Sequence, residues 1–399
     1  MIFMSYWFAA FAASFFILYW LFPIFRVRRF LILAFGFAFQ VHFAGPAGVL
    51  PIIALGLFTY FAGISKRRSL QITTIAVCVA ALVFYKYTIF LAAEFIGFFS
   101  IELASQSVSV LKTTILPAAP PLAISFFVFE FVHYLTDVLK GQRPIRSAAD
   151  FGLFALFWPT MVAGPIKRYE QFIPSMRAGC TRVPAEDVMI GLMRVATGLV
   201  KKFLADNLTL MLDYWVAQFD TAPTGVQWLV FVGIGLRILL DFSGYSDIAI
   251  GFARMMGIKV PENFNWPYLA SGPIDFWRRW HISLSTWIRD YVYIPLGGGR
   301  VGMLRKIVNG LFAFALCGLW HGAGWNFLVW GIYHGAGIAI NTLWKEKAVK
   351  LYSIPHDLQW LARFCSWGAT LIFVLVGWLF FFFPVSQALH MLTILAGVK

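Results

Sequence analysis

The stretch Asp275–Arg300, DFWRRWHISLSTWIRDYVYIPLGGGR, combines six formally charged residues, one histidine and many aromatic rings. The chain around it has a different character, since 60% of its 399 residues are hydrophobic and only 13% are charged. Soluble domains have a smaller apolar share and about 25% charged residues. The composition therefore predicts a membrane protein in which this stretch is a polar exception.

Long apolar runs predict the fold class. A transmembrane helix needs about 20 mostly apolar residues, and the runs predict an all-α, polytopic membrane protein with about 11 transmembrane helices in one domain, residues 1–399. Phe151–Gly164 is short and ends in WPTMVAGP, which favours a re-entrant segment that turns back inside the membrane. The apolar runs are Ile2–Ile24, Phe30–Phe43, Val49–Ile64, Ile72–Phe99, Ile115–Val138, Phe151–Gly164, Val188–Leu204, Trp228–Met256, Ile307–Leu319, Asn326–Leu343 and Leu361–Phe383.

Basic clusters explain the net charge of +14 without a nucleic-acid partner. Two predicted spans separate each cluster from the next, so all three lie on one side, which the positive-inside rule assigns to the cytoplasm. The N-terminus is then outside, and the first run is expected to be a retained helix, because no Lys or Arg precedes Arg26. The clusters are Arg26, Arg28 and Arg29; Lys66, Arg67 and Arg68; and Lys140, Arg143 and Arg146.

Several common catalytic and metal-binding motifs do not occur in the sequence. The four cysteines are scattered without a C-x-x-C pair, so neither a disulfide framework nor a metal site is predicted. H-E-x-x-H, Walker A and G-x-S-x-G patterns are missing as well. The single G-x-G-x-x-G match, Gly297 to Gly302, lies in a glycine-rich turn without a strand–turn–helix unit and is attributed to chance.

The run Trp228–Met256 contains charged residues, which membrane spans usually avoid. Asp241 follows Arg237 by four residues, about one helical turn, and the spacing predicts an ion pair between them. A structural ion pair is the favoured interpretation, because buried charges are usually paired. Asp241 is also kept as a candidate for substrate contact.

The quoted stretch predicts an amphipathic helix at the membrane–water boundary, where Trp and Tyr are enriched and Arg side chains snorkel. On a continuous helix, Trp277 and His281 would share one face, and so would Arg279 and Ser283. Pro295 and the glycines that follow it are expected to end this helix in a flexible turn.

The stretch Gly318–Gly335, GLWHGAGWNFLVWGIYHG, contains the motif Gly-x-x-His-Gly twice. Each copy is also G-x-x-x-G, the spacing that allows close helix packing in membranes. His334, in the middle of a span, is interpreted as a packing residue. His321 is interpreted as functional, because it lies beside Trp320 and a Gly-Ala-Gly break where a helix can open onto a cavity.

His281 and His321, 40 residues apart, are compatible with three chemistries. They are bis-histidine haem ligation, a proton relay in a transporter, and general base catalysis by a side chain with a near-neutral pKa. Their spacing alone does not decide among these.

Both motif stretches resemble the membrane-bound O-acyltransferase family, most closely its bacterial alginate O-acetyltransferase branch. Weaker matches are FWPTMVAGPIKRYEQF, LDFSGYSDIAIG and AISFFVFEFVHYLTDV, so that the resemblance extends from about Ala123 to His334. YIPLGGGR favours the alginate-like branch over the related teichoic-acid D-alanylation branch. The resemblance implies a ring of helices with re-entrant segments around a central tunnel.

The resemblance also implies roles for the two histidines. His321 matches the catalytic histidine of the family, and we expect it to act as general base for the acceptor hydroxyl. His281 matches the second active-site position, and we expect it to donate a hydrogen bond to the thioester oxygen. Asn326 is either a second donor or the cap of the helix that follows it. Further candidates for substrate contact are Trp280, Arg279, Ser283, Trp320 and Asp241.

The donor implied by the resemblance is acetyl-CoA, entering from the cytoplasm, with no metal and no bound cofactor. Expected partners are the lipid bilayer and an extracytoplasmic SGNH-type acetyltransferase or polysaccharide acceptor, and the expected location is the bacterial inner membrane. The remaining alternatives are D-alanyl transfer from a carrier-protein thioester, a transporter with a histidine proton relay, and a haem protein.

Overall fold

A computed structural model describes residues 3–117, 120–348 and 355–398. Every regular element in these ranges is a helix, which confirms the all-α fold class. The chain divides into two compact units, Met1–Leu199 with Ser246–Pro261 and Val200–Tyr245 with Glu262–Lys399. Residues at the start of one predicted apolar run (Ile2) and inside another (Ala118 and Ala119) lie outside the described ranges.

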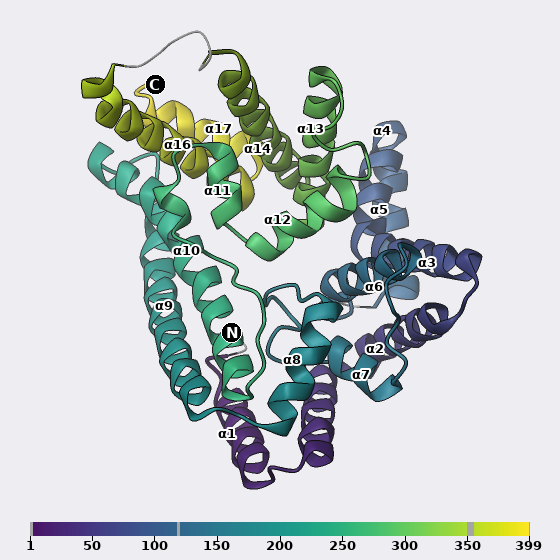
Figure 1. The fold of residues 1–399 in the computed structure, drawn as a ribbon. Coiled ribbons are helices and arrows are strands. Elements are labelled where there is room, and N and C mark those ends of the chain that lie inside the picture. The colour runs from purple at the N-terminus through teal and green to yellow at the C-terminus, as the bar shows by residue number, and fades with distance from the viewer. Residues whose placement is uncertain (1–2, 118–119, 349–354, 399) are drawn as a thin grey trace. The chain divides into compact units, whose positions relative to one another are not determined.

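The first unit contains the helices of the N-terminal half and the end of α10 (Figure 1). Its elements are α1 (Tyr6–Leu21), α2 (Phe25–Ile64), α3 (Arg68–Leu91), η1 (Ala92–Ile96), α4 (Gly97–Phe99), α5 (Ile101–Val110), η2 (Leu111–Ile115), α6 (Ile124–Leu139), α7 (Ala148–Ala155), α8 (Tyr169–Thr181) and the first part of α9 (Ala185–Ala217).

The second unit contains the rest of α9, most of α10 (Thr224–Met255) and the C-terminal helices. Its further elements are η3 (Pro267–Leu269), α11 (Pro273–Arg279), α12 (Ile282–Ile288), η4 (Arg289–Tyr293), α13 (Met303–His321), α14 (Trp325–Leu343), η5 (Trp344–Ala348), η6 (His356–Leu358), α16 (Gln359–Phe382) and α17 (Val385–Leu395).

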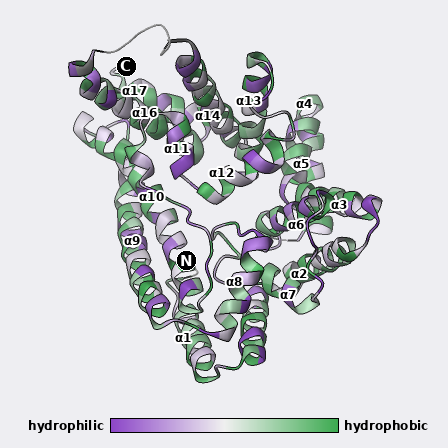
Figure 2. Ribbon diagram, in the orientation of Figure 1, coloured by the Kyte–Doolittle hydropathy of each residue, from purple (hydrophilic) through white to green (hydrophobic). Residues whose placement is uncertain are grey.

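Several helices are long and apolar enough to cross a membrane, which agrees with a multi-pass membrane protein. Figure 2 shows the hydrophobic colour on most of the long helices, whereas α11 and α12 carry hydrophilic stretches. Over the described residues there are six such segments, fewer than the eleven predicted runs, since α1, α6 and α7 have only 16, 16 and 8 residues and the longer helices α9 and α14 are not among the six. The six are Phe25–Gly45, Ala47–Ile64, Arg68–Phe99, Thr224–Met255, Met303–His321 and Gln359–Phe382.

Three predicted runs differ from simple spans. Phe30–Phe43 and Val49–Ile64 form parts of one element, α2, which is interrupted at Gly45 with φ 64° and ψ 173°. A positive φ of this kind is accessible to glycine without steric cost. The run Phe151–Gly164 contains only α7, whose eight residues extend about 12 Å, well short of the roughly 30 Å hydrocarbon core.

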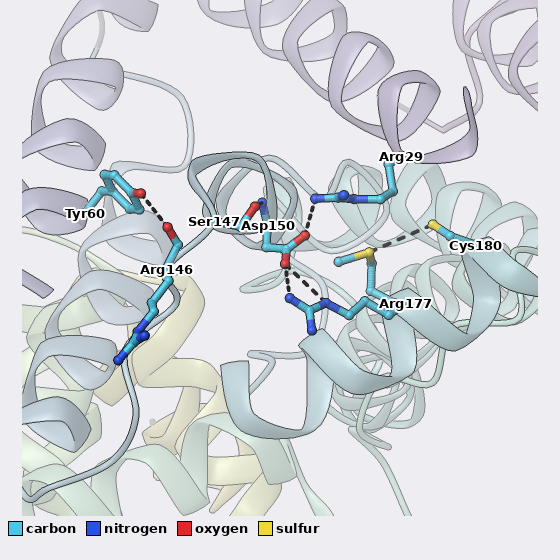
Figure 3. A network of polar contacts seen from close by, with 8 residues as sticks. Arg29, Tyr60, Arg146, Ser147, Asp150, Arg177 and Cys180 are labelled. Carbon is cyan, nitrogen blue, oxygen red and sulfur yellow. Dashed lines mark hydrogen bonds and ion pairs between the residues drawn. The ribbon is translucent and has the colours of Figure 1, made fainter. Parts of the chain in front are cut away.

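A buried carboxylate connects three helices of the first unit (Figure 3). Asp150 on α7 is 1% exposed and accepts hydrogen bonds from Arg29 on α2 and Arg177 on α8. Ser147 caps α7, since its hydroxyl accepts from the Asp150 backbone N–H at 3.2 Å. Arg29, a member of the first basic cluster, therefore also has a structural role as a partner of Asp150.

Close packing between α13 and α14 supports the site in the second unit (Figure 1). A Cβ at Gly318 would lie 2.1 Å from the Phe327 carbonyl oxygen, and one at Gly331 would lie 2.3 Å from the Phe314 carbonyl oxygen. Only glycine allows the two backbones to approach this closely. The packing role predicted for the two G-x-x-x-G motifs is confirmed.

Candidate active site

The backbone at His281 is the main local feature of the site. α11 ends at Arg279, and α12 begins at Ile282. His281 between them has φ 42° and ψ 54°, a left-handed conformation that is uncommon for a residue with a side chain. The prediction of one continuous helix is therefore wrong, and so are the shared helical faces it implied for Trp277 with His281 and for Arg279 with Ser283.

Tertiary contacts hold this break in place. The Ile282 N–H donates to the Asn263 carbonyl oxygen at 3.0 Å. Trp280, 3% exposed, packs in an aromatic cluster with ring centroids 5.6 Å from Phe276 and 4.7 Å from Trp378. These contacts fix the ring of Trp280 in the core and turn the next residue, His281, out of helical register. The proposed contact of Trp280 with substrate stays a prediction.

Asn263 determines which nitrogen of His281 carries the proton. The side-chain oxygen Oδ1 of Asn263 accepts from the Ser283 N–H at 3.2 Å and the Ser283 hydroxyl at 2.9 Å. It also lies 3.1 Å from Nδ1 of His281. A backbone N–H can only donate, so Oδ1 is an acceptor and Nδ1 of His281 is the donor. In the neutral ring Nε2 then carries a lone pair and no proton.

Nε2 of His281 is buried and has no hydrogen-bond partner within the part of the chain that the structure describes. Burial lowers the pKa of His281 well below its usual value, and the neighbouring His321 lowers it further. His281 is therefore neutral at neutral pH and presents a hydrogen-bond acceptor. This geometry does not match the expected donation to a thioester oxygen, which would need a proton on Nε2.

His321 is the last residue of α13 and lies in an aromatic enclosure. Its ring centroid is 4.7 Å from that of Trp320, 5.1 Å from Trp330 and 5.0 Å from Phe381, and the planes are inclined by 71°, 86° and 79°. The turn after it requires Gly322, because a Cβ there would lie 2.0 Å from the Phe327 ring. His321 as a whole is half-buried.

Trp320 connects the two histidines. Its ring centroid lies 6.2 Å from that of His281 in addition to the 4.7 Å contact with His321. A third ring, Phe242 on α10, is 4.6 Å from His281. The structure thus brings together the two residues predicted to be catalytic, and both belong to the second unit.

The two polar candidates Arg279 and Asn326 make local contacts. Arg279 pairs with Asp275 one turn earlier at 2.9 Å, and both side chains are about one-third exposed. Asn326 donates from Nδ2 to the Phe381 carbonyl oxygen at 3.3 Å, which ties the start of α14 to the end of α16. The N-cap of α14 is Gly324, so the predicted capping role of Asn326 is wrong.

Asp241 pairs with Lys202 on α9, and the predicted pair with Arg237 is wrong. The Arg237 guanidinium instead lies 5.1 Å from the centroid of the Phe382 ring. The Asp241 side chain is half exposed, and Lys202 also lies 3.6 Å from Asp206. The partner of Asp241 therefore comes from the neighbouring helix α9.

His334 is fully buried, as expected for a packing residue. Its Nδ1 accepts from Nε1 of Trp277 at 3.3 Å. A Cβ at Gly377 would lie 2.5 Å from Nε2 of His334, so α16 approaches this ring at a glycine.

Asn263 belongs to the site, although no sequence pattern predicts it. It is 1% exposed and precedes His281 by 18 positions, in the loop that leads to α11. No spacing or composition distinguishes this asparagine from others in the chain. Its role follows only from the three hydrogen bonds that its oxygen accepts.

Comparison with known proteins points to one family. Residues 135–384 match the sequence model of the MBOAT, membrane-bound O-acyltransferase family. The Probable alginate O-acetylase AlgI of Azotobacter vinelandii is 34% identical over 374 residues, which covers 91% of this chain and 71% of that protein.

Two further relatives have other substrates in their names. A Peptidoglycan O-acetyltransferase of Helicobacter pylori is 32% identical over 289 residues, which covers 65% of this chain and 54% of that protein. A Teichoic acid D-alanyltransferase of Bacillus subtilis is 31% identical over 251 residues, covering 59% and 62%. The chain thus spans less than two thirds of the length of these two relatives.

Proposed function

Because the chain belongs to the membrane-bound O-acyltransferase family, we propose that it transfers an acetyl group from a cytoplasmic thioester, acetyl-CoA, towards a hydroxyl group of an extracytoplasmic polysaccharide. Membership assigns the reaction class, O-acyl transfer, and favours it over the haem and proton-relay readings of the two histidines. The names of the alginate and peptidoglycan relatives support acetyl as the acyl group and a polysaccharide as the final acceptor. We also place the protein in the bacterial inner membrane with its N-terminus outside.

The observation that carries this proposal is the meeting of His281 and His321 at Trp320. Acyl transfer to a hydroxyl breaks the thioester C–S bond, forms an ester C–O bond, and moves the hydroxyl proton to the departing thiolate. His321 is assigned as the base that takes this proton, because it is less buried than His281. A positioned base of this kind contributes roughly 10²–10⁴-fold to the rate.

His281 has a different role in this proposal. Its Nε2 lone pair accepts a hydrogen bond, so it binds an N–H or O–H group of a substrate and orients that substrate for attack. The low pKa that follows from burial makes His281 a poor base, which leaves proton abstraction to His321. Trp320, between the two, forms a wall shared by both parts of the site.

D-alanyl transfer from a carrier protein is the second candidate, favoured by the likeness to the B. subtilis enzyme. Both donors are thioesters, and a comparison of the two separates the candidates. The purified, monodisperse protein is incubated with radiolabelled acetyl-CoA or with a D-alanyl carrier protein, and thiol release is measured. We expect release from acetyl-CoA only. Release from the carrier protein only would replace acetyl transfer by D-alanyl transfer.

The polysaccharide is proposed to be reached through an extracytoplasmic SGNH-type acetyltransferase. With that partner left out, acetyl-CoA is expected to be hydrolysed slowly to free acetate, since water replaces the absent acceptor. Addition of a polysaccharide without the partner is expected to leave the rate unchanged. Direct acetylation of the added polysaccharide would show that no partner is needed.

A further inference from the structure

A cavity of about 780 Å³ lies in the second unit, lined by α11, α12, η4, α13, α14 and η5. Neither His281 nor His321 is among the residues that line it. It is therefore distinct from the site described above, and the proposed function does not use it.

The walls of this cavity are apolar along α13 and α14, which have 19 residues each. On α13 the lining positions recur every three or four residues from Ile307 to Cys317, which places them on one helical face. On α14, Gly335 to Thr342 form the opposite wall. These walls suit hydrocarbon, since they offer aliphatic carbons, one phenylalanine ring and a thiol.

Three hydroxyl groups on the walls, all of Ser or Thr, donate their hydrogens to backbone carbonyl groups. Ser285 donates to the Trp280 carbonyl oxygen at 3.2 Å, Thr286 to that of Ile282 at 2.8 Å, and Thr342 to that of Ile338 at 2.8 Å. A ligand with amide groups, such as the pantetheine arm of a thioester donor, would find few free donors here. An alkyl chain needs none.

The cavity lining carries a net positive charge. Four cationic residues and one anionic residue, Glu346, line it, which gives a net charge of +3. Lys306 pairs with Glu346 at 2.5 Å. Arg278 and Lys345 are exposed and have no anionic partner among the described residues. The cationic lining residues are Arg278, Arg289, Lys306 and Lys345.

The length of the apolar wall matches one leaflet of a bilayer. Lys306 lies in the first turn of α13, and Cys317 lies eleven residues further on, about 16 Å along the axis. Half of a hydrocarbon core of about 30 Å is about 15 Å. The pair between Lys306 and Glu346 puts Lys306 and Lys345 at the same end of the apolar walls. A basic end followed by apolar walls over this depth has the polarity of a phospholipid, and basic pockets between membrane helices bind anionic head groups.

We propose that this cavity binds an anionic phospholipid, with one acyl chain along α13 and α14 and the phosphate against Arg278 and Lys345. The inference does not depend on the proposed acyl transfer. It predicts a lipid that stays with the protein in detergent and is selected by head-group charge.

The first test fills the cavity. A Cβ at Gly310, which lines the wall, would meet no heavy atom within 4 Å, so Gly310→Leu places a side chain in the cavity without a clash at its root. Gly368→Leu on α16 is the matched control, since its Cβ also meets nothing within 4 Å and it does not line the cavity. Both are helical positions, where leucine is favoured over glycine.

Native mass spectrometry of the full chain, titrated with palmitoyl-oleoyl phosphatidylglycerol (POPG) or the corresponding phosphatidylcholine (POPC), measures the affinity for the first lipid. We expect wild type and Gly368→Leu to bind POPG at least about tenfold more tightly than Gly310→Leu does. Equal binding by Gly310→Leu and wild type would overturn the proposal.

The second test removes the positive charges of Arg278 and Lys345. Arg278→Gln with Lys345→Gln is expected to weaken POPG binding roughly 30-fold, because each basic residue near an anionic head group contributes roughly fivefold. POPC binding should stay the same. The control is Lys66→Gln with Arg68→Gln, an equal charge change at exposed residues outside the cavity. Unchanged POPG binding in the first double variant, or displacement of POPG by coenzyme A, would contradict an anionic lipid site.

Discussion

At the scale of single residues, the sequence predicts the identities of the two histidines but not the position of a proton. The motif resemblance leads to His281 and His321, and the structure places both beside Trp320. The tautomer of His281 depends on Asn263, which is distant in sequence and becomes a neighbour only through the loop before α11. Hydrogen-bond direction is a tertiary property, so no spacing rule predicts it.

Replacement of Asn263 tests this positioning role. Asn263→Ala removes the acceptor that holds Nδ1–H, and we expect acyl transfer to fall about 10- to 100-fold, as the loss of a buried hydrogen-bond partner costs about 1–3 kcal/mol. Asn263→Asp keeps an acceptor oxygen at this position and should retain most of the activity. The measurement is thiol release at pH 7, with thermal unfolding as the check on folding. Full activity of Asn263→Ala would exclude the role.

The lowered pKa of His281 also predicts how the stability of the folded protein depends on pH. In the unfolded chain this histidine takes up a proton near pH 6.5, whereas in the folded protein burial and His321 keep its pKa well below that value. Between these two values the unfolded state binds more protons, so stability falls as the pH drops below about 6.5. His281→Asn removes this contribution.

The expected result is a smaller loss of thermal midpoint between pH 7 and pH 5 for His281→Asn than for wild type in the same detergent. His390→Asn is a suitable control, because His390 is exposed and pairs with Asp220. Parallel midpoints for wild type and His281→Asn over this range would mean that His281 does not stay neutral in the folded protein.

At the scale of helices, local sequence patterns predict which helices pack closely, but they do not predict where a helix is interrupted. The glycine spacing of α13 and α14 correctly predicts their close approach, because the motif itself creates the contact surface. The aromatic stretch does not predict the break at His281, since the aromatic cluster around Trp280 and the bond to Asn263 override helical propensity. Sequence spacing also does not predict the ion pair of Asp241, because its partner Lys202 lies on another helix.

The helix contact can be tested by adding single methyl groups. Gly318→Ala would place its Cβ 2.1 Å from the Phe327 carbonyl oxygen, so we expect a loss of about 1–3 kcal/mol and a lower thermal midpoint. Gly310→Ala lies on the same helix with nothing within 4 Å of its Cβ and should be neutral or slightly stabilising. Equal midpoints for the two variants would contradict backbone contact at Gly318.

At the scale of the whole molecule, composition already predicts an all-α, multi-pass membrane protein, and the structure and the family match agree. The number of spans is less predictable, because runs such as Ile2–Ile24 and Phe151–Gly164 give only the short helices α1 and α7. Hydropathy measures how apolar a segment is, whereas helix ends depend on caps, glycines and tertiary contacts.

The central claim is that His321 is the base for acyl transfer. The most direct measurement is release of thiol from labelled acetyl-CoA by the purified protein, with His321→Ala compared with wild type and with His390→Ala, an exposed histidine outside the site. We predict that His321→Ala loses roughly 10²–10⁴-fold in rate while its thermal midpoint and the activity of His390→Ala stay near those of wild type. A His321→Ala protein that releases thiol at the wild-type rate would contradict the account.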